Sequence, residues 1–388
     1  MAACNAAVVS PSPTTVAPPS PTPNASTEVT AAPSPTTGPS VAVLIGTFFS
    51  TGSMATPRVT QTATLLADGR VLIAGGYDGS TALASAALYD PASGRFSPTA
   101  SMTVARSGQT STLLADGRVL IAGGYDGSTA LASAELFDPA TGAFSPTGSM
   151  AQPHEGGTAT LLLDGEVLMA GGIDPASPEE QGFASAELYN PATGKFRTTG
   201  SLVQGRYDQA ATLLADGRVL VIGGAGRPAD LASAELYDPK TGRFAATDSM
   251  AQARYGPTAT LLSGGSVLVA GGWNDTTQTT LASAELFDPK TGQFTSAGAM
   301  AQARSDDTAT LLADGRVLLV GGICQAGVLA SAELYDPGTG EFSDAGSMAR
   351  GRDDHTATVL HDGSVLMAGG YVDVNQQTPV ASAEVWRP

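Results

Sequence analysis

Cysteine, histidine and basic residues are all scarce in this chain of 388 residues. Its two cysteines, Cys4 and Cys324, exclude a framework of several disulfides. Lysine and arginine number 19 against 36 acidic residues, a net charge of −17. Such an acidic surface repels phosphate backbones and anionic membranes, which argues against nucleic acid as a partner. No apolar run approaches the length needed to span a bilayer.

The N-terminal stretch also lacks charge, since Glu28 is the only charged residue from position 5 to about 40. The remaining residues there are mostly Pro, Ser, Thr, Ala and Val. Such a segment buries too little apolar surface to offset its ordering entropy, and its prolines keep it extended. We therefore expect a disordered stalk within residues 1–40 and one folded domain over residues 41–388.

The start of the chain, Met1-Ala2-Ala3-Cys4, resembles the end of a bacterial lipoprotein signal, in which small residues precede a lipidated cysteine. The basic and apolar parts of such a signal do not precede it here, and a chance cysteine is the alternative interpretation. With the stalk behind it, Cys4 is expected to be lipidated. The protein is accordingly expected to be exported and to lie outside the cell or at its surface, touching a membrane only through this anchor.

Beyond residue 40 the chain repeats itself. A Gly-Gly pair ends an apolar run at intervals of 48 to 52 residues, with the pairs beginning at Gly75, Gly123, Gly171, Gly223, Gly271, Gly321 and Gly369. No window carries helical periodicity. A period near 50 residues with short strands in each unit is typical of a β-propeller.

The strands can be assigned within the unit at 106–150. Two apolar runs, TSTLL and RVLIAG, are joined by Asp116-Gly117, a strong signal for a short hairpin. ASAELF is the expected third strand. DPATG then forms a turn, and AFSPTG is the expected fourth, outer strand.

The two ends of the repeat region complete each other. The last unit stops at its third strand, in ASAEVWRP (381–388), whereas GTFFSTGSM (46–54) matches the fourth strand of other units. We therefore expect residues 41–54 to supply the outer strand of blade seven and close the ring. Sharing one blade between the chain ends also protects exposed strand edges.

The repeat resembles kelch over about residues 41–388. It has a Gly-Gly pair, an aromatic residue about thirteen positions later (Tyr89, Tyr189 and Tyr237 are examples) and a second aromatic about seven further on, which is Phe here where kelch usually has Trp. The resemblance implies an all-β, seven-bladed propeller. Kelch propellers include binding domains, scaffolds and a few enzymes, so the resemblance implies little about function.

The two faces of the expected propeller differ. The turns ADGR and DPATG recur nearly unchanged on one face, whereas the loops between strands two and three vary from blade to blade. We therefore expect any binding surface on this second face, which we call the variable face; neutral drift of the loops is the alternative.

An arginine recurs on the variable face in all blades but one, which carries His154 instead. A ring of arginines could hold an anion. The stronger interpretation is architectural, because a recurring glutamate is available to pair with each arginine. The two sets are Arg58, Arg106, Arg206, Arg254, Arg304 and Arg352, and Glu135, Glu187, Glu235, Glu285, Glu333 and Glu384.

Blades six and seven carry acidic residues after this arginine, in RSDD (304–307) and RDDH (352–355). Four carboxylates and an imidazole at one channel mouth could bind a divalent cation such as Ca²⁺. A solvated acidic rim is the alternative. The candidate metal ligands are Asp306, Asp307, Asp353, Asp354 and His355.

Aromatic residues follow the Gly-Gly pair in some blades, and exposed rings beside charged groups are suited to stacking on sugars. Packing within the blade is the alternative role. Trp273, in WNDTTQTT, is the least repeat-like of them and the leading candidate. The full set of candidate ligand-binding residues is Trp273, Tyr77, Tyr125, Tyr371, Arg304, Arg352, Tyr207, Asp208 and Tyr255.

The segment at 352–370 is similar to the part of the galactose oxidase family that carries a copper-ligand histidine, which maps to His355. The neighbouring tyrosine ligand of that family is replaced here by Asp354, and no Cys–Tyr pair is identifiable. The resemblance therefore does not carry copper-radical oxidation over to this chain.

Three hypotheses for function remain. The first is a secreted or surface-displayed binding module that recognises a glycan or a protein through the variable face. The second is an extracellular carbohydrate-active enzyme using the Asp/His cluster of blades six and seven, and the third is a passive scaffold. The propeller is expected to be monomeric.

Overall fold

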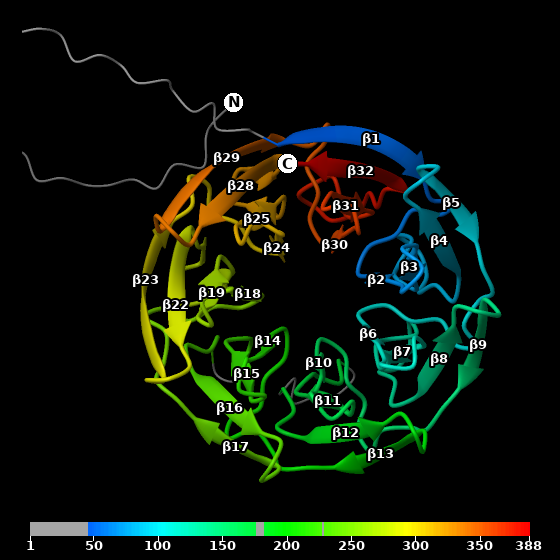
Figure 1. Cartoon of the computed structure of the whole chain (residues 1–388), viewed down its shortest axis with the longest axis horizontal. Helices are drawn as coiled ribbons and strands as arrows, with labels where there is room; N and C mark the ends of the chain where they lie inside the picture. The colour runs from blue at the N-terminus through cyan, green and yellow to red at the C-terminus, as the bar shows by residue number, and fades with distance from the viewer. Residues whose placement is uncertain (1–45, 176–181, 227–228) are drawn as a thin grey trace, which may run out of the picture.

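The computed structural model describes residues 46–388 except 176–181 and 227–228. Seven four-stranded antiparallel sheets stand as blades around a central axis (Figure 1). This arrangement confirms the predicted all-β, seven-bladed propeller. The described part of the chain contains no helix, and therefore none long and apolar enough to cross a membrane. The predicted stalk, Cys4 and residues 41–45 lie outside the described residues.

The strands of the first four blades follow one another along the chain, from the channel outward. Blade one has β2 (Thr62–Leu65), β3 (Val71–Ala74), β4 (Ala86–Asp90) and β5 (Arg95–Pro98). Blade two has β6 (Thr110–Leu113), β7 (Val119–Ala122), β8 (Ala134–Asp138) and β9 (Ala143–Pro146). Blade three has β10 (Thr158–Leu161), β11 (Val167–Ala170), β12 (Ala186–Asn190) and β13 (Lys195–Thr198). Blade four has β14 (Ala210–Leu213), β15 (Val219–Ile222), β16 (Ala234–Asp238) and β17 (Arg243–Ala246).

Blades five and six each carry an additional small hairpin. Blade five has β18 (Thr258–Leu261), β19 (Val267–Ala270), β22 (Ser283–Asp288) and β23 (Gln293–Ala299), with the hairpin β20 (Trp273–Asn274) and β21 (Thr279–Thr280). Blade six has β24 (Thr308–Leu311), β25 (Val317–Val320), β28 (Ser331–Asp336) and β29 (Glu341–Ser347), with the hairpin β26 (Ile323–Cys324) and β27 (Gly327–Val328). Blade seven has β30 (Thr356–Val359), β31 (Val365–Ala368), β32 (Ser382–Arg387) and β1 (Thr47–Ser53).

The hydrophobic core lies between adjacent blades. In each blade the second strand is fully buried, as VLIA is in β3 and β7. Leu72 and Leu88 of blade one pack against Ile121 and Phe137 of blade two, and the same arrangement recurs around the ring. Each blade therefore buries its apolar residues only in the presence of its neighbours, which makes closure of the ring a requirement for a complete core.

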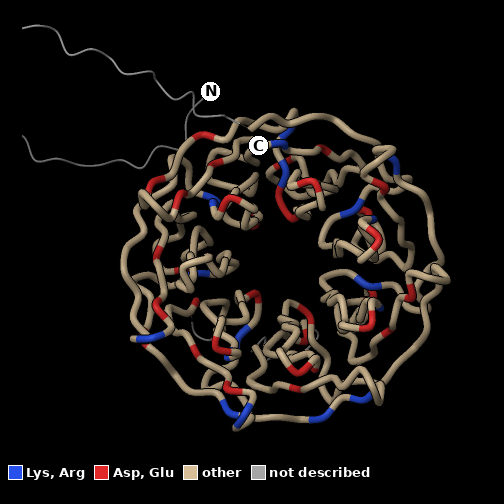
Figure 2. Tube along the Cα trace, in the orientation of Figure 1, with Lys and Arg blue, Asp and Glu red and all other residues tan. Residues whose placement is uncertain are grey.

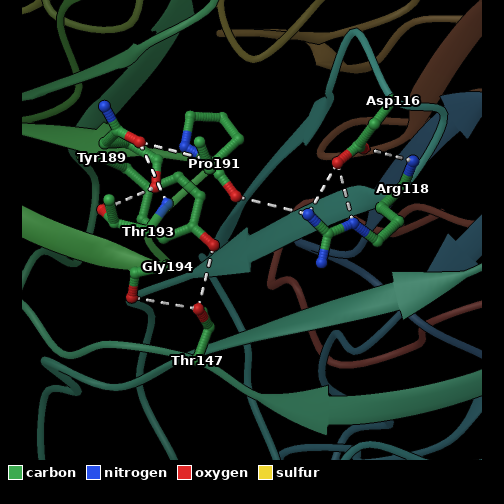
Figure 3. Close-up of polar contacts among 9 residues, drawn as sticks. Asp116, Arg118, Thr147, Tyr189, Pro191, Thr193 and Gly194 are labelled. Atoms are coloured by element: carbon green, nitrogen blue, oxygen red, sulfur yellow. Dashed lines mark hydrogen bonds and ion pairs between the residues drawn. The ribbon is translucent and has the colours of Figure 1, made fainter.

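The recurring turns ADGR and DPATG join neighbouring blades. Asp116 accepts hydrogen bonds from the Arg118 guanidinium at 2.6 and 2.9 Å, and the Arg118 Nη2 also approaches the Pro191 carbonyl of the next blade at 3.4 Å (Figure 3). Close by, Thr147 and the Tyr189 hydroxyl are 2.9 Å apart across the same boundary (Figure 3). These contacts between blades account for the nearly unchanged sequence of the turns on the face opposite the variable face.

Strand β1 closes the ring by pairing antiparallel with β32, with Phe48 opposite Trp386. Trp386 is fully buried, and its indole N–H donates to the Ala345 carbonyl of blade six at 3.1 Å. A side chain at Gly46 would collide with the Trp386 ring. The predicted completion of the last blade by the N-terminal segment is confirmed.

Candidate functional site

The recurring arginines are buried between the second and third strands of their blades. The Arg304 guanidinium donates to the Gly321 and Ser331 carbonyls and lies 2.8 Å from the Glu333 carboxylate. Glu333 in turn accepts the backbone N–H groups of Ala301 and Gln302. The same ion pair forms in the blades that contain Arg106, Arg206, Arg254 and Arg352. The architectural interpretation of the arginine ring is therefore confirmed.

Arg304 and Arg352 consequently do not lie on a ligand-binding surface, contrary to expectation. Their exposed fractions are 0% and 1%. Carbonyls, a serine hydroxyl and a glutamate carboxylate engage the two Nη atoms of each guanidinium, and separating it from its glutamate would leave an unpaired buried charge. In blade three His154 replaces the arginine, contacting the Gly171 carbonyl and lying 3.8 Å from Glu187.

Two positions after each arginine, the chain turns at the mouth of the central channel. The residue there has a positive φ of 48° to 62° in all seven blades: Thr60, Gly108, Gly156, Asp208, Gly256, Asp306 and Asp354. Their backbones are linked from blade to blade, as in the Asp208 N–H to Gly156 carbonyl bond of 2.7 Å. Left-handed backbone is uncommon for residues other than glycine, and such strain is concentrated at functional sites.

The glycines of this ring make room for carboxylates. A Cβ at Gly156 would lie 2.6 Å from the Asp208 carboxylate, and one at Gly256 would lie 3.3 Å from that of Asp306. Asp208 and Asp306 therefore each lie against the glycine of the preceding blade. Figure 2 shows acidic residues at the inner ends of several blades around the opening.

A cavity of about 700 Å³ opens at this mouth. Five acidic residues line it. Asp307 is one of them, and the other four, which we call the mouth carboxyls, are Glu155, Asp208, Asp306 and Asp354. Tyr207, Tyr255 and Gln376 contribute to the same wall. No ion pair of the described residues includes any mouth carboxyl, so within the described ranges no cationic side chain compensates their charge.

The mouth carboxyls hold their protons more tightly than ordinary acids. Burial, followed by the charge of the nearby Asp208, raises the pKa of Glu155 to about 7. Burial, followed by the charges of Asp353 and Asp208, raises the pKa of Asp306 to about 6. Burial is also the largest cause of the raised pKa values of Asp208 and Asp354. Clustered, desolvated carboxyl groups in a cleft are typical of functional sites.

Trp273 lies at a second, adjoining cavity of about 400 Å³. The two cavities share Tyr255, Asp306 and Gln376, so they form one continuous surface. The Trp273 indole N–H donates to Asp275 at 3.2 Å, and its backbone pairs with Tyr255. The structure thus brings together Tyr207, Asp208, Tyr255 and Trp273 of the predicted ligand-binding residues.

The other predicted aromatic residues lie elsewhere on the variable face. Tyr77, Tyr125 and Tyr371 each continue the second strand beyond the Gly-Gly pair and form isolated bridges with neighbouring backbone. Tyr371 is 9% exposed, which leaves little of its ring available to a ligand. None of the three lines the two cavities.

The five predicted metal ligands do not converge. Asp306 and Asp354 face the channel mouth, whereas Asp353 accepts a hydrogen bond from Gln376 at 2.9 Å. The Asp307 carboxylate faces Gly271 of the preceding blade, and buried His355 lies 3.3 Å from Thr308 of blade six. Throughout the described ranges, no three His, Cys, Asp or Glu side chains form a group that could hold a metal ion.

Glu155 is the mouth carboxyl that sequence reasoning missed. It comes one position after His154, where other blades carry Val59, Ser107, Tyr207, Tyr255, Ser305 and Asp353. A charged residue at an otherwise mostly uncharged position of the repeat was the available signal. Its proximity to Asp208 is visible only once blades three and four are placed side by side.

Comparison with known proteins supports the assignment of the repeat. A family model described as the kelch motif matches residues 59–103, 108–151 and 254–301. The chain carries kelch repeats. A kelch propeller is a fold that binds proteins or other ligands, and these matches establish the function no more closely than that. No curated protein matches the sequence.

Among solved structures, the chain is similar to a fungal alcohol oxidase of the AA5 family, determined in complex with copper. The TM-score is 0.73 at 18% identity, over 89% of this chain and 76% of the oxidase. Similarity at this identity shows a shared propeller fold alone.

The histidines of this chain do not fit a copper centre. His355 is 6% exposed and lies between blades, and burial lowers its pKa to about 3. His154 is buried against Gly171, and His361 lies with Asp68 and Asp90 in a cavity away from the mouth. The nitrogen ligands are therefore dispersed across the molecule, and we derive no reaction step through copper.

Proposed function

We propose that this propeller is a binding module that captures a basic segment of a protein ligand in the acidic mouth of its variable face. The observation that supports this proposal is the convergence of four mouth carboxyls around one cavity, with no ion pair to any of them in the described part of the chain. Kelch propellers commonly bind protein partners, which agrees with this class of ligand.

The negative charge of the cavity favours a cationic ligand. Crowded carboxylates repel one another, and this repulsion contributes to the raised pKa of Asp306 and Asp354. A lysine or arginine side chain entering the cavity relieves that repulsion and forms charge-assisted hydrogen bonds. Neutral sugar hydroxyls form hydrogen bonds but do not compensate the charge. The net charge of −17 further steers a basic ligand toward the protein.

The aromatic residues add a second contribution. Tyr207 and Tyr255 stand edge to face, with ring centroids 6.2 Å apart, at the wall of the cavity. Trp273 extends this wall along the adjoining cavity. Aromatic faces attract ammonium and guanidinium groups through cation–π interactions. The same rings can stack on a sugar, so a glycan is the competing ligand.

The decisive experiment compares the two ligand classes directly. Isothermal titration at pH 8 and low salt should show binding of a lysine- and arginine-rich peptide and not of a matched acidic peptide. Asp306→Asn combined with Asp354→Asn should weaken this binding about tenfold or more, whereas Asp344→Asn, on strand β29 outside both cavities, should not. Binding of neutral oligosaccharides with no response to basic peptides would overturn the proposal in favour of a lectin.

A second candidate function is acid–base catalysis on a carbohydrate. It is favoured by Glu155, whose pKa of about 7 suits a general acid, beside Asp208 in the same cavity. Product formation from a panel of glycosides, lost in Glu155→Gln, would support an enzyme. Binding without turnover across that panel would leave the binding module as the function.

We also propose that this module is displayed outside the cell on the stalk of residues 1–40, through lipidation of Cys4. The proposal rests on the sequence alone, namely the small residues before Cys4 and the proline-rich segment after it, in which Glu28 is the only charged residue. A surface anchor and an extended stalk would hold the variable face away from the membrane, where a protein ligand can reach it.

A further inference from the structure

Blade one lacks the glutamate that pairs with the buried arginine in other blades. The position of Glu135 in blade two is occupied by Ala87 in blade one. Arg58 is nevertheless present and 2% exposed, and its guanidinium keeps the other contacts of the repeat. It donates to the Gly75 carbonyl at 2.8 Å, the Ser85 carbonyl at 3.0 Å and the Ser85 hydroxyl at 3.1 Å.

The missing carboxylate leaves more than one group without a partner. In blade two, Glu135 accepts the backbone N–H groups of Thr103 and Val104 as well as the Arg106 guanidinium. Every other glutamate of this series accepts at least one equivalent backbone N–H, whether its partner is arginine or His154.

The equivalent donors in blade one are the amides of Ala55 and Thr56, directly after strand β1. The structure gives neither amide a hydrogen-bond partner among the described residues. The Arg58 Nη2, the atom that reaches the glutamate in the paired blades, donates only to the Ser85 hydroxyl here. Two backbone amides and one guanidinium nitrogen therefore surround the space that a glutamate side chain fills in the other blades.

The charge of Arg58 needs compensation. Burial lowers the pKa of Arg58 to about 10, so the guanidinium remains positively charged at neutral pH. For Arg106 and the other paired arginines, the neighbouring glutamate opposes this effect of burial. A buried, unpaired charge is strongly unfavourable. A counterion in the place of the absent carboxylate would compensate it.

We propose that the space between Ala87, Arg58 and the amides of Ala55 and Thr56 is a binding site for one small monovalent anion, either chloride or a short carboxylate. The space corresponds to the carboxymethyl part of a glutamate side chain, which excludes larger anions. The bound anion ties Arg58 of blade one to the end of the closing strand β1. The site thus links anion binding to closure of the ring.

The test uses thermal unfolding of the full chain at constant ionic strength, with chloride, formate or acetate compared with gluconate. The small anions should raise Tm by about 2 °C or more in a saturable manner, because a ligand bound only to the folded state stabilises it. Ala87→Glu supplies an internal carboxylate, so it should raise Tm in gluconate and abolish the response to small anions. A Tm that does not depend on the anion in the natural chain would overturn the proposal.

A matched variant creates the same site in another blade. Glu135→Ala leaves Arg106, Thr103 and Val104 in the arrangement of blade one, so its loss of stability should be partly restored by formate or chloride. Absence of any rescue would contradict the proposal even if Ala87→Glu failed to fold. A bromide soak of crystals of the natural chain should give an anomalous peak beside Arg58, and its absence there would also contradict it. A response to formate and acetate but not chloride identifies carboxylates as the natural ligands.

Discussion

The Tyr255 hydroxyl donates a 2.7 Å hydrogen bond to the Asp208 carboxylate, which belongs to the preceding blade. This bond lowers the pKa of Asp208 against the larger opposing effect of burial, and it therefore favours the charged form at the channel mouth. It also fixes the orientation of one wall of the cavity. A tyrosine that joins two blades in this way holds both the geometry and the charge of the proposed binding surface.

Tyr255→Phe should weaken binding of a basic peptide and should do so more at pH 6.5 than at pH 8. Without the hydroxyl the pKa of Asp208 rises, and less negative charge remains at the lower pH. Loss of a hydrogen bond to a charged acceptor should also reduce the free energy of unfolding by about 1–3 kcal/mol. Titration calorimetry at the two pH values measures the first effect, and Tyr125→Phe, away from both cavities, serves as the control. Equal loss of affinity at both pH values would contradict the electrostatic explanation.

Asp307→Gln should stabilise the protein at pH 8 and much less at pH 5. Burial raises the pKa of Asp307 to about 7, and neither carboxylate oxygen has a hydrogen-bond partner among the described residues. Glutamine occupies this position in three other blades and donates to a carbonyl of the preceding blade, as Gln109 does to Ala74. The substitution therefore restores the ordinary contact of the repeat.

The direction of this pH dependence follows from the number of protons that the folded and unfolded states bind. Between the unfolded pKa near 4 and the folded value of about 7, the folded state binds more protons, so Asp307 contributes stability at low pH that is lost as pH rises through 7. The difference in unfolding free energy between variant and natural chain should grow by about 2–4 kcal/mol from pH 5 to pH 8. His355 has the opposite dependence, because its pKa is lowered, but it is present in both proteins and cancels. Denaturant unfolding that showed a constant difference would refute the assignment.

Deletion of residues 1–53 should destabilise the propeller sharply, whereas deletion of residues 1–40 should change Tm little. The longer deletion removes strand β1 and exposes the edge of β32 together with buried Trp386. It retains Met54, which packs in the core between blades seven and one. Circular dichroism melts of the two truncated chains measure the difference. Identical melting temperatures would show that the closing strand is dispensable.

Cys4→Ser should abolish partitioning of the expressed protein into detergent if Cys4 is the site of lipidation. The acyl chains, not the acidic propeller, would supply the affinity for the detergent phase. Phase separation of cell extracts followed by immunoblotting measures it. Unchanged partitioning of Cys4→Ser would exclude the anchor.

Most of the fold could be predicted from the sequence because its signals are local and repeated. Asp116-Gly117 specifies a hairpin from two residues, and the same dipeptide or its equivalent recurs in every blade. The closing strand could also be predicted, since residues 46–54 match the end of other repeats. The ion pair of Arg304 and Glu333 followed from recurrence alone, although the burial that removes Arg304 from the surface did not.

The site was predicted less completely, because side chains far apart in sequence meet there. The aspartates of RSDD and RDDH were expected to form one cluster, but consecutive residues at the mouth point in different directions. Asp306 and Asp307 both line the cavity. The Asp306 carboxylate lies against Gly256, whereas the Asp307 carboxylate lies against Gly271, just after the second strand of blade five. Asp306 has a left-handed backbone, which directs the side chains of Asp306 and Asp307 to different neighbours. No sequence pattern predicted this conformation.

The sequence by itself therefore determined the repeat, the strands, the hairpin turns and the shared last blade, since each depends on short-range turn chemistry and apolar alternation. Only the tertiary structure decided which side chains share a cavity. Ring closure brings Glu155, Asp208, Asp306 and Asp354 to one mouth from four different blades, and it leaves Arg58 buried beside Ala87 without a carboxylate. Both outcomes depend on burial and on contacts between blades, which exist only when the ring is complete.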